Sequence, residues 1–162
     1  MSSSLVFDYV ARQKLGGCHA SITYFKQFPV LTPEQINEKW QTEFITRVAE
    51  LCYCNHDMDG WAEELAEELS DEQKSLFLNI VNQTLYVYDP EPRAVLQTEL
   101  DAIFAKLYGL NTENLKYIFD PEDVCRVGCI NETFRVLKDS EIREFGEYRT
   151  KRLVMEAWGK FV

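Results

Sequence analysis

The sequence predicts a mainly helical protein, a bundle of about five to seven helices with a small β element near the N-terminus. Apolar residues recur at three- to four-residue steps along most of the 162-residue chain, the period of an amphipathic helix. Thr32 followed by Pro33, and Ser70 followed by two acidic residues, are helix start signals. Only the stretch from Ile22 to Phe28 alternates in the manner of a strand.

The N-terminal elements follow from local signals. Residues 5–15 form a helical pattern that runs into Gly16 and Gly17, a glycine stop. Residues 22–28 then suit a strand that Pro29 ends, because proline cannot donate to a sheet. A long helix is predicted over residues 32–51, with the apolar face Ile36, Trp40, Phe44, Val48 and Leu51.

The remaining elements are predicted from the same periodicity. An extended piece is expected at 84–92, where Pro90 and Pro92 end it. A loop containing Gly128 is expected before Ser140, which opens one or two final helices. The other predicted helices span residues 60–69, 71–81, 95–107, 112–118 and 140–161.

Composition and charge limit the class of protein. Hydrophobic residues make up 46% and aromatic residues 13% of the chain, which is typical of a globular core. No apolar run is long enough to span a membrane, and the first residues lack the pattern of a secretory signal, so we expect a cytoplasmic protein without membrane partners. The five cysteines are then expected to be reduced thiols.

The net charge of −10 is distributed unevenly along the chain. Residues 1–31 carry +2, residues 32–134 carry −14, and residues 135–162 carry +2. Contact with phosphate is therefore expected from the two ends.

Metal sites are not favoured by the spacing of the candidate ligands. Asn55, Asp57 and Asp59 alternate before Gly60 as in a calcium loop, but the twelfth position is Ala66 and not a bidentate glutamate. A plain loop before an acidic helix is the better interpretation. The candidate zinc ligands lack the two-residue spacing that is typical of a zinc knuckle. They are Cys52, Cys54, His56, Cys125 and Cys129. Cys52 is expected to pack on the inner face of a helix. We predict no metal.

Catalytic motifs are also missing from the sequence. The only histidines are His19 and His56, and there is no nucleophile elbow, phosphate loop or nucleotide-binding glycine run. The acidic row between Glu63 and Glu72 is expected to be a solvated helix face. We predict no catalytic residue in this chain.

Four stretches resemble, in the same order, the C-terminal end of large adenine-specific DNA methyltransferases of the type IIG restriction-modification kind. They are SLVFDYVARQKLGGCHASITYFKQFPVLTP, EFITRVAELCYC, ELDAIFAKLYGLNTENLKYIFDPEDV and ETFRVLKDSEIREFGEYRTKRLVMEAW. The resemblance covers most of the chain and is weakest between about Trp61 and Gln83. It implies a catalytic domain and an S-adenosylmethionine site far upstream in the parent enzyme, with no cofactor in this chain.

The resemblance implies two parts. Residues 1–31 would end a target-recognition module, with YFKQFPVLTP as its last strand, and residues 32–162 would be a helical C-terminal domain that braces it. The expected partners are double-stranded DNA and the remainder of the methyltransferase.

The candidate DNA contacts are the basic and polar side chains at the two ends, since phosphate contacts and base contacts come from such groups. Tyr9, Tyr24, Trp40 and Phe44 are expected to be core residues. The candidate DNA contacts are Arg12, Lys14, His19, Ser21 and Lys26, with Arg143, Arg149, Lys151 and Arg152 as a second set.

A different function is compatible with the acidic middle of the chain. An acidic helical module could bind a basic cleft of a methylase or nuclease, as a protein-interaction module or a DNA mimic. The position of the charge discriminates the two. Mimicry needs a contiguous acidic surface, whereas a recognition tail needs a basic edge around residues 12–26.

Overall fold

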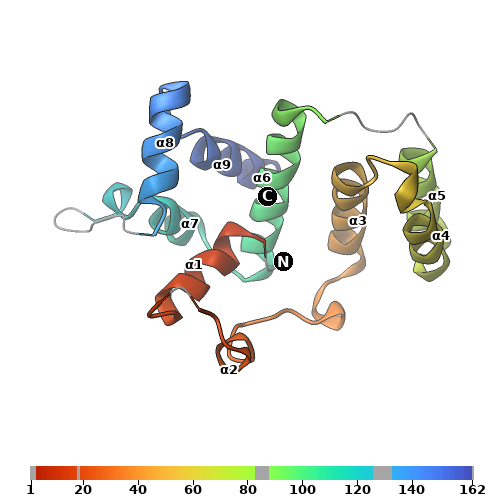
Figure 1. Cartoon of the computed structure of the whole chain (residues 1–162), viewed down its shortest axis with the longest axis horizontal. Coiled ribbons are helices and arrows are strands. Elements are labelled where there is room, and N and C mark those ends of the chain that lie inside the picture. Colours follow the sequence, from red (N-terminus) through yellow and green to blue (C-terminus); the bar gives the residue numbers. More distant parts are fainter. Residues whose placement is uncertain (1–2, 18, 83–87, 126–132, 162) are drawn as a thin grey trace. The chain divides into compact units, whose positions relative to one another are not determined.

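The computed structural model describes residues 3–17, 19–82, 88–125 and 133–161. In these residues it contains nine α-helices and three short 3₁₀ helices and no β-strand (Figure 1). The prediction of a mainly helical protein is confirmed. The prediction of a small β element near the N-terminus is wrong.

The stretch that alternates like a strand is helical instead. α2 (Ile22–Phe25) is a single turn, in which the amides of Phe25 and Lys26 donate to the carbonyl oxygens of Ser21 and Ile22 at 3.1 Å. An isolated strand would leave its backbone groups without partners. The turn satisfies them locally. It also brings the rings of Phe25 and Phe28 within 6.3 and 5.3 Å of the ring of Phe7.

The chain divides into two compact units. Residues 1–31 and 98–162 form one, here called the terminal unit, and residues 32–97 form the other, here called the central unit. The division falls at residue 31, as in the sequence analysis, but residues 98–162 group with the N-terminal segment. The functional roles of the two parts remain predictions.

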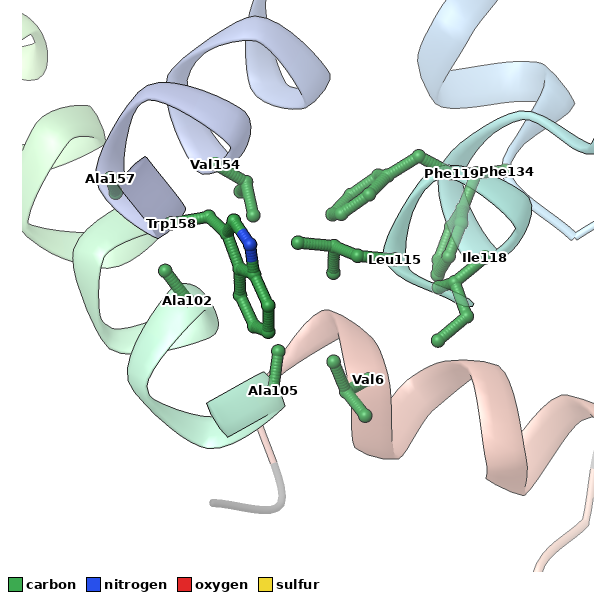
Figure 2. Packing of buried hydrophobic residues seen from close by; sticks show 10 residues of the cluster. All are labelled: Val6, Ala102, Ala105, Leu115, Ile118, Phe119, Phe134, Val154, Ala157 and Trp158. Carbon is green, nitrogen blue, oxygen red and sulfur yellow. The ribbon is translucent and has the colours of Figure 1, made fainter. Parts of the chain in front are cut away.

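The terminal unit is built around one apolar cluster. Val6 of α1 (Leu5–Lys14) packs with Leu115 of α7 (Thr112–Phe119) and Trp158 of α9 (Arg149–Lys160). Figure 2 shows these side chains converging from helices that lie about a hundred residues apart in the sequence. The unit also contains η3 (Pro121–Asp123), α8 (Arg135–Phe145) and the part of α6 (Pro90–Leu107) from Thr98 onward.

A buried carboxylate holds the start of α1. Asp101 on α6 is 8% exposed, and its Oδ1 accepts a hydrogen bond of 2.7 Å from the amide of Leu5. Burial raises the pKa of Asp101 to about 7, although the hydrogen bond from Leu5 opposes this rise. The hydrogen bond from Leu5 to Asp101 thus attaches the first turn of α1 to α6, and burial favours the neutral form of the Asp101 carboxyl group.

The central unit has its own core. α3 (Glu38–Cys52) contributes Ala49, and α5 (Asp71–Val81) contributes the fully buried Phe77. α4 (Asp59–Glu68) packs Ala62 and Ala66 against them. The predicted stripe of α3 from Trp40 to Leu51 is only half-buried; the residues of α3 in this core are Ile45 and Ala49, followed by Tyr53.

Several predicted boundaries shift by a few residues. The start signal at Thr32 opens only η1 (Pro33–Gln35), in which Gln35 Oε1 accepts from the Thr32 amide at 2.8 Å, and Asn37 caps α3 separately. α6 begins at Pro90 and not near Val95, because proline is tolerated in a first turn, where no amide partner is needed. α8 begins at Arg135, so Ser140 lies inside it, and Gly146 (φ 76°) ends it. Residues 84–87 of the predicted extended piece and the loop around Gly128 lie outside the described residues, whereas residues 90–92 are helical, so the extended prediction is wrong there.

The pKa of Asp101 generates a test of the α1 to α6 attachment. A carboxyl whose pKa is raised on folding stabilises the fold at low pH, and this contribution is lost as pH rises from about 4 through about 7. Asp101→Asn keeps an acceptor for the Leu5 amide and cannot ionise. We expect its free energy of unfolding to exceed that of the wild type at pH 8, by up to about 4 kcal/mol.

Urea unfolding of both proteins at pH 5, 6, 7 and 8, followed by circular dichroism, measures this difference. Asp139→Asn, at an exposed position on α8, is the matched control and should follow the wild type. Parallel curves for Asp101→Asn and the wild type would contradict the ionisation of Asp101 as the cause.

The core of the central unit generates a second prediction. Phe77→Ala should lower the free energy of unfolding of this unit by about 3–5 kcal/mol, because it opens a cavity among fully buried side chains. Leu76→Ala, at a neighbouring side chain that is 42% exposed, should cost less than about 1 kcal/mol. Hydrogen exchange of the α3 and α5 amides reports the change, and equal effects of the two variants would refute the assigned core.

Candidate nucleic-acid interface

The N-terminal candidates lie on α1 and on the segment that follows it. The Arg12 side chain is 56% exposed, and its Nε donates to both carboxylate oxygens of Asp8 at 3.0 Å. The guanidinium also lies 5.8 Å from the centre of the Phe134 ring. The Lys14 ammonium donates to the carbonyl oxygen of Gln27 at 3.0 Å, which places Lys14 beside the end of α2. These contacts fix the positions of Arg12 and Lys14, and both side chains stay exposed to solvent.

The remaining N-terminal candidates are exposed. Ser21 precedes α2 but its side chain makes no capping hydrogen bond, and Lys26 follows the helix. His19 is also exposed, and no described residue pairs with the side chains of His19, Ser21 or Lys26. Asp8 is the only acidic residue among residues 1–31. Among the cations of residues 1–31 only Arg12 is paired with a carboxylate of a described residue, and the segment keeps a net charge of +2.

The C-terminal candidates are arranged differently. The Arg152 guanidinium is paired with Glu147 and Glu156, each at 2.9 Å. Arg149 stacks on Phe145, with its guanidinium 4.8 Å from the ring centre. Arg143 is exposed. The structure thus offers a weaker basic surface here than at residues 12–26.

Lys151 belongs to an ion-pair cluster between η3, α8 and α9. Its ammonium lies 2.6 Å from Asp123 and 3.5 Å from the buried Asp120, and Lys138 lies 2.7 Å from the same Asp120 carboxylate. Burial alone would raise the pKa of Asp120, but the hydrogen bond from Lys138 and the charges of both lysines hold it below its ordinary value. Lys151 is therefore engaged in the fold and is poorly placed for phosphate.

Two adjoining cavities lie beside the N-terminal candidates in the terminal unit. One, of about 390 Å³, has mostly apolar walls that include Val10 and Pro29. The other, of about 480 Å³, is more polar and is lined by Arg12 and Gln13. Tyr9 and Tyr117 line both cavities. We call the two cavities together the tyrosine cleft.

Sequence reasoning did not find the tyrosine cleft. Tyr9 was expected to be a core residue, yet it is only half-buried and borders open space, and Tyr24 is 43% exposed. Tyr117 lies more than a hundred residues from Tyr9 in the sequence. No local pattern brings these two rings together, because only the packing of α1 against α7 does so.

The soft ligands do not form a metal site in the part of the chain that the structure describes, where no three acidic, histidine or cysteine side chains are grouped to hold an ion. Cys52 is exposed, so its predicted packing on an inner helix face is wrong. Cys125 is disulfide-bonded, which corrects the expectation of reduced thiols for that residue, whereas Cys52 and Cys54 are free.

The calcium-like loop is used for internal contacts. It forms η2 (His56–Met58), and the hydroxyl of Tyr53 donates to Asp59 at 2.6 Å. The hydrogen bond from Tyr53 is the main cause that lowers the pKa of Asp59. Asp59 serves here to join the end of α3 to the start of α4.

Comparison with protein-family models, with curated proteins and with solved structures found no match to this chain. Within the described residues, no helix combines the length and the apolar character needed to cross a membrane.

The ion-pair cluster generates a prediction about stability. Asp120→Asn leaves Lys138 and Lys151 beside a neutral group, and we expect the free energy of unfolding to fall by about 3 kcal/mol at pH 7. Because the pKa of Asp120 is lowered in the fold, its contribution is present above its unfolded pKa and is lost as pH falls through the folded value. The wild type and the variant should therefore converge in acid.

Denaturant unfolding at pH 7 and at pH 3 measures this convergence. Glu144→Gln, at an exposed position of α8, is the control and should change stability by less than about 0.5 kcal/mol. A constant difference between Asp120→Asn and the wild type at both pH values would contradict an ionic origin.

Proposed function

We propose that this chain is the non-catalytic, DNA-contacting C-terminal part of an adenine-specific DNA methyltransferase of a restriction-modification system. The resemblance of four ordered stretches supplies the class of protein. The observation that carries the proposal is the exposed basic segment around Arg12, Lys14 and Lys26, which holds one acid against three cations. Such a segment suits contacts to the DNA backbone, which position a protein on the duplex.

The helices of the terminal unit give this segment a rigid base. Val6 is buried in the core with Leu115 and Trp158, so the helix that carries Arg12 and Lys14 is attached to α7 and α9. The Tyr108 hydroxyl donates to the Pro29 carbonyl oxygen at 2.6 Å and holds the other end of the segment. These helical contacts support the segment in place of the strand that the sequence predicts at residues 22–28. They let phosphate contacts be made without a large loss of backbone entropy.

The lack of catalytic motifs fits a positioning role. In this proposal the methyl transfer, and S-adenosylmethionine with it, belong to the remainder of the methyltransferase. This chain would hold double-stranded DNA in register, with phosphate contacts from residues 12–26 and a minor contribution from Arg143 and Arg149. Lys151 and Arg152 drop out of the candidate set, because carboxylates neutralise both.

A second candidate function rests on the central unit. Residues 32–97 hold fourteen acidic and four basic side chains, so they account for the whole net charge of −10. Glu63, Glu64, Glu67 and Glu68 of α4 are all exposed, and none of them forms an ion pair with a described residue. An acidic surface of this kind favours binding to a basic protein partner.

Charge neutralisation of the basic segment tests the proposed function. The triple variant Arg12→Gln, Lys14→Gln, Lys26→Gln should bind a mixed-sequence duplex more weakly than the wild-type chain of 162 residues. Loss of three phosphate contacts should reduce the slope of log K against log salt by about 2.7. Fluorescence anisotropy with a labelled 20-base-pair duplex at several salt concentrations measures both quantities.

The matched control is Lys39→Gln, an exposed lysine of the central unit, which should leave the affinity and the slope unchanged. Equal binding by the wild type and the triple variant would contradict the proposal. If the wild type binds no duplex but binds a basic protein, and replacement of Glu63, Glu64, Glu67 and Glu68 by glutamine abolishes that binding, the second function is supported instead.

A further inference from the structure

The tyrosine cleft has the composition of a site for a planar ligand. Its apolar cavity, of about 390 Å³, lies within the range of small-molecule pockets, and it is partly open to solvent. The rings of Tyr9 and Tyr117 line it, and Tyr117 is 40% exposed. Aromatic side chains at such a position are platforms on which a flat, unsaturated ring can stack.

Polar groups without partners face this cleft. Asn114 lines the apolar cavity, where its Oδ1 accepts from the Asn111 amide at 3.2 Å while its NH₂ group donates to no described residue. The hydroxyls of Tyr9 and Tyr117 likewise form no hydrogen bond with a described residue. Burial and the proximity of Tyr117 raise the pKa of Tyr9, so its phenol stays a neutral donor at pH 7. A few convergent donors among apolar walls are typical of a ligand site.

Arg12 is oriented toward the polar cavity by two contacts. Both carboxylate oxygens of Asp8 bind its Nε, and the ring of Phe134 lies against the guanidinium. Its two terminal amino groups have no partner among the described residues. A guanidinium held through Nε and by a ring, with both Nη atoms free, is prepared for bidentate contact with an anion such as a phosphate.

We infer that the tyrosine cleft binds one unpaired nucleotide, with the base in the apolar cavity against Tyr9 and Tyr117 and the phosphate at the terminal amino groups of Arg12. The inference rests on the proposed function, which brings a DNA strand to the adjoining basic segment. Base stacking on aromatic rings together with backbone contact to Arg is the common mode of single-strand recognition. Asn114 would donate to an acceptor on the edge of the base.

The ligand of the tyrosine cleft could come from two sources, an unpaired base in a DNA strand and a free nucleotide. A duplex with one unpaired 2-aminopurine and a fully paired duplex of the same flanking sequence test the first source. Free 2-aminopurine nucleotide tests the second. All measurements use the full chain, and both the 2-aminopurine fluorescence and the anisotropy of a remote label are recorded.

The expected result is a preference of about tenfold for the duplex with the unpaired base, accompanied by quenching of its fluorescence on stacking. Tyr117→Ala should abolish the preference and the quenching while leaving affinity for the paired duplex unchanged. Tyr88→Ala, at a tyrosine of the central unit that is 73% exposed, is the matched control and should behave as the wild type. Arg12→Gln should weaken binding of both duplexes and of the free nucleotide.

The outcomes separate this inference from the proposed function. Equal affinity for the two duplexes, with the salt dependence predicted for the basic segment, would overturn the nucleotide site and leave the proposed function standing. Binding of free nucleotide that Tyr117→Ala abolishes, with no binding of either duplex, would support the site and overturn the DNA role. Preserved quenching in a folded Tyr117→Ala variant would overturn the assignment of the cleft.

Discussion

The burial of Val6 among Leu115, Ala105 and Trp158 is the contact on which the terminal unit depends (Figure 2). It attaches the first helix to α6, α7 and α9 in the second half of the chain, and the Asp101 carboxylate accepts a hydrogen bond from the same first turn. Without this packing, the part of α1 that carries Arg12 and Lys14 would lose its apolar attachment to α7 and α9. With this packing, Arg12 and Tyr9 of α1 lie beside Tyr117 of α7, and the tyrosine cleft forms between two helices that are distant in the sequence.

Electrostatics divides the molecule in the same places as the packing. The acidic excess lies in residues 32–97, whereas the terminal unit has as many basic as acidic side chains. Within the terminal unit the pairing of charges, and not their number, distinguishes the two ends. Lys151 and Arg152 are bound to carboxylates, while residues 12–26 contain no acid, and the nearby Asp8 binds only the Nε of Arg12. The net charge is +2 for residues 1–31 and also for residues 135–162, so the charge count did not distinguish the two ends.

Errors in the sequence-based expectations have specific physical causes. Ile22–Phe28 alternates like a strand, but no neighbouring strand exists in the described chain to pair with it, and the contacts of Phe25 and Phe28 with Phe7 favour a turn. Proline at position 90 was interpreted as an end because proline interrupts a helix interior, yet it begins α6, where its missing amide costs nothing. The apolar face predicted for α3 differs from the face that packs in the core. The helix has apolar residues on two neighbouring faces, and tertiary packing buries the one with Ile45 and Ala49.

The sequence by itself determined the helical class, the positions of most helices and the separation of charge, because these follow from periodicity, capping residues and composition within a few turns of chain. It also identified the basic residues near the N-terminus. Only the tertiary structure decided which of the cations remain available and which are neutralised, since an ion pair such as Lys151 with Asp123 joins distant segments. The tyrosine cleft belongs to the same category. Its two rings come from α1 and α7 and lie more than a hundred residues apart in the sequence, and only long-range packing places them together.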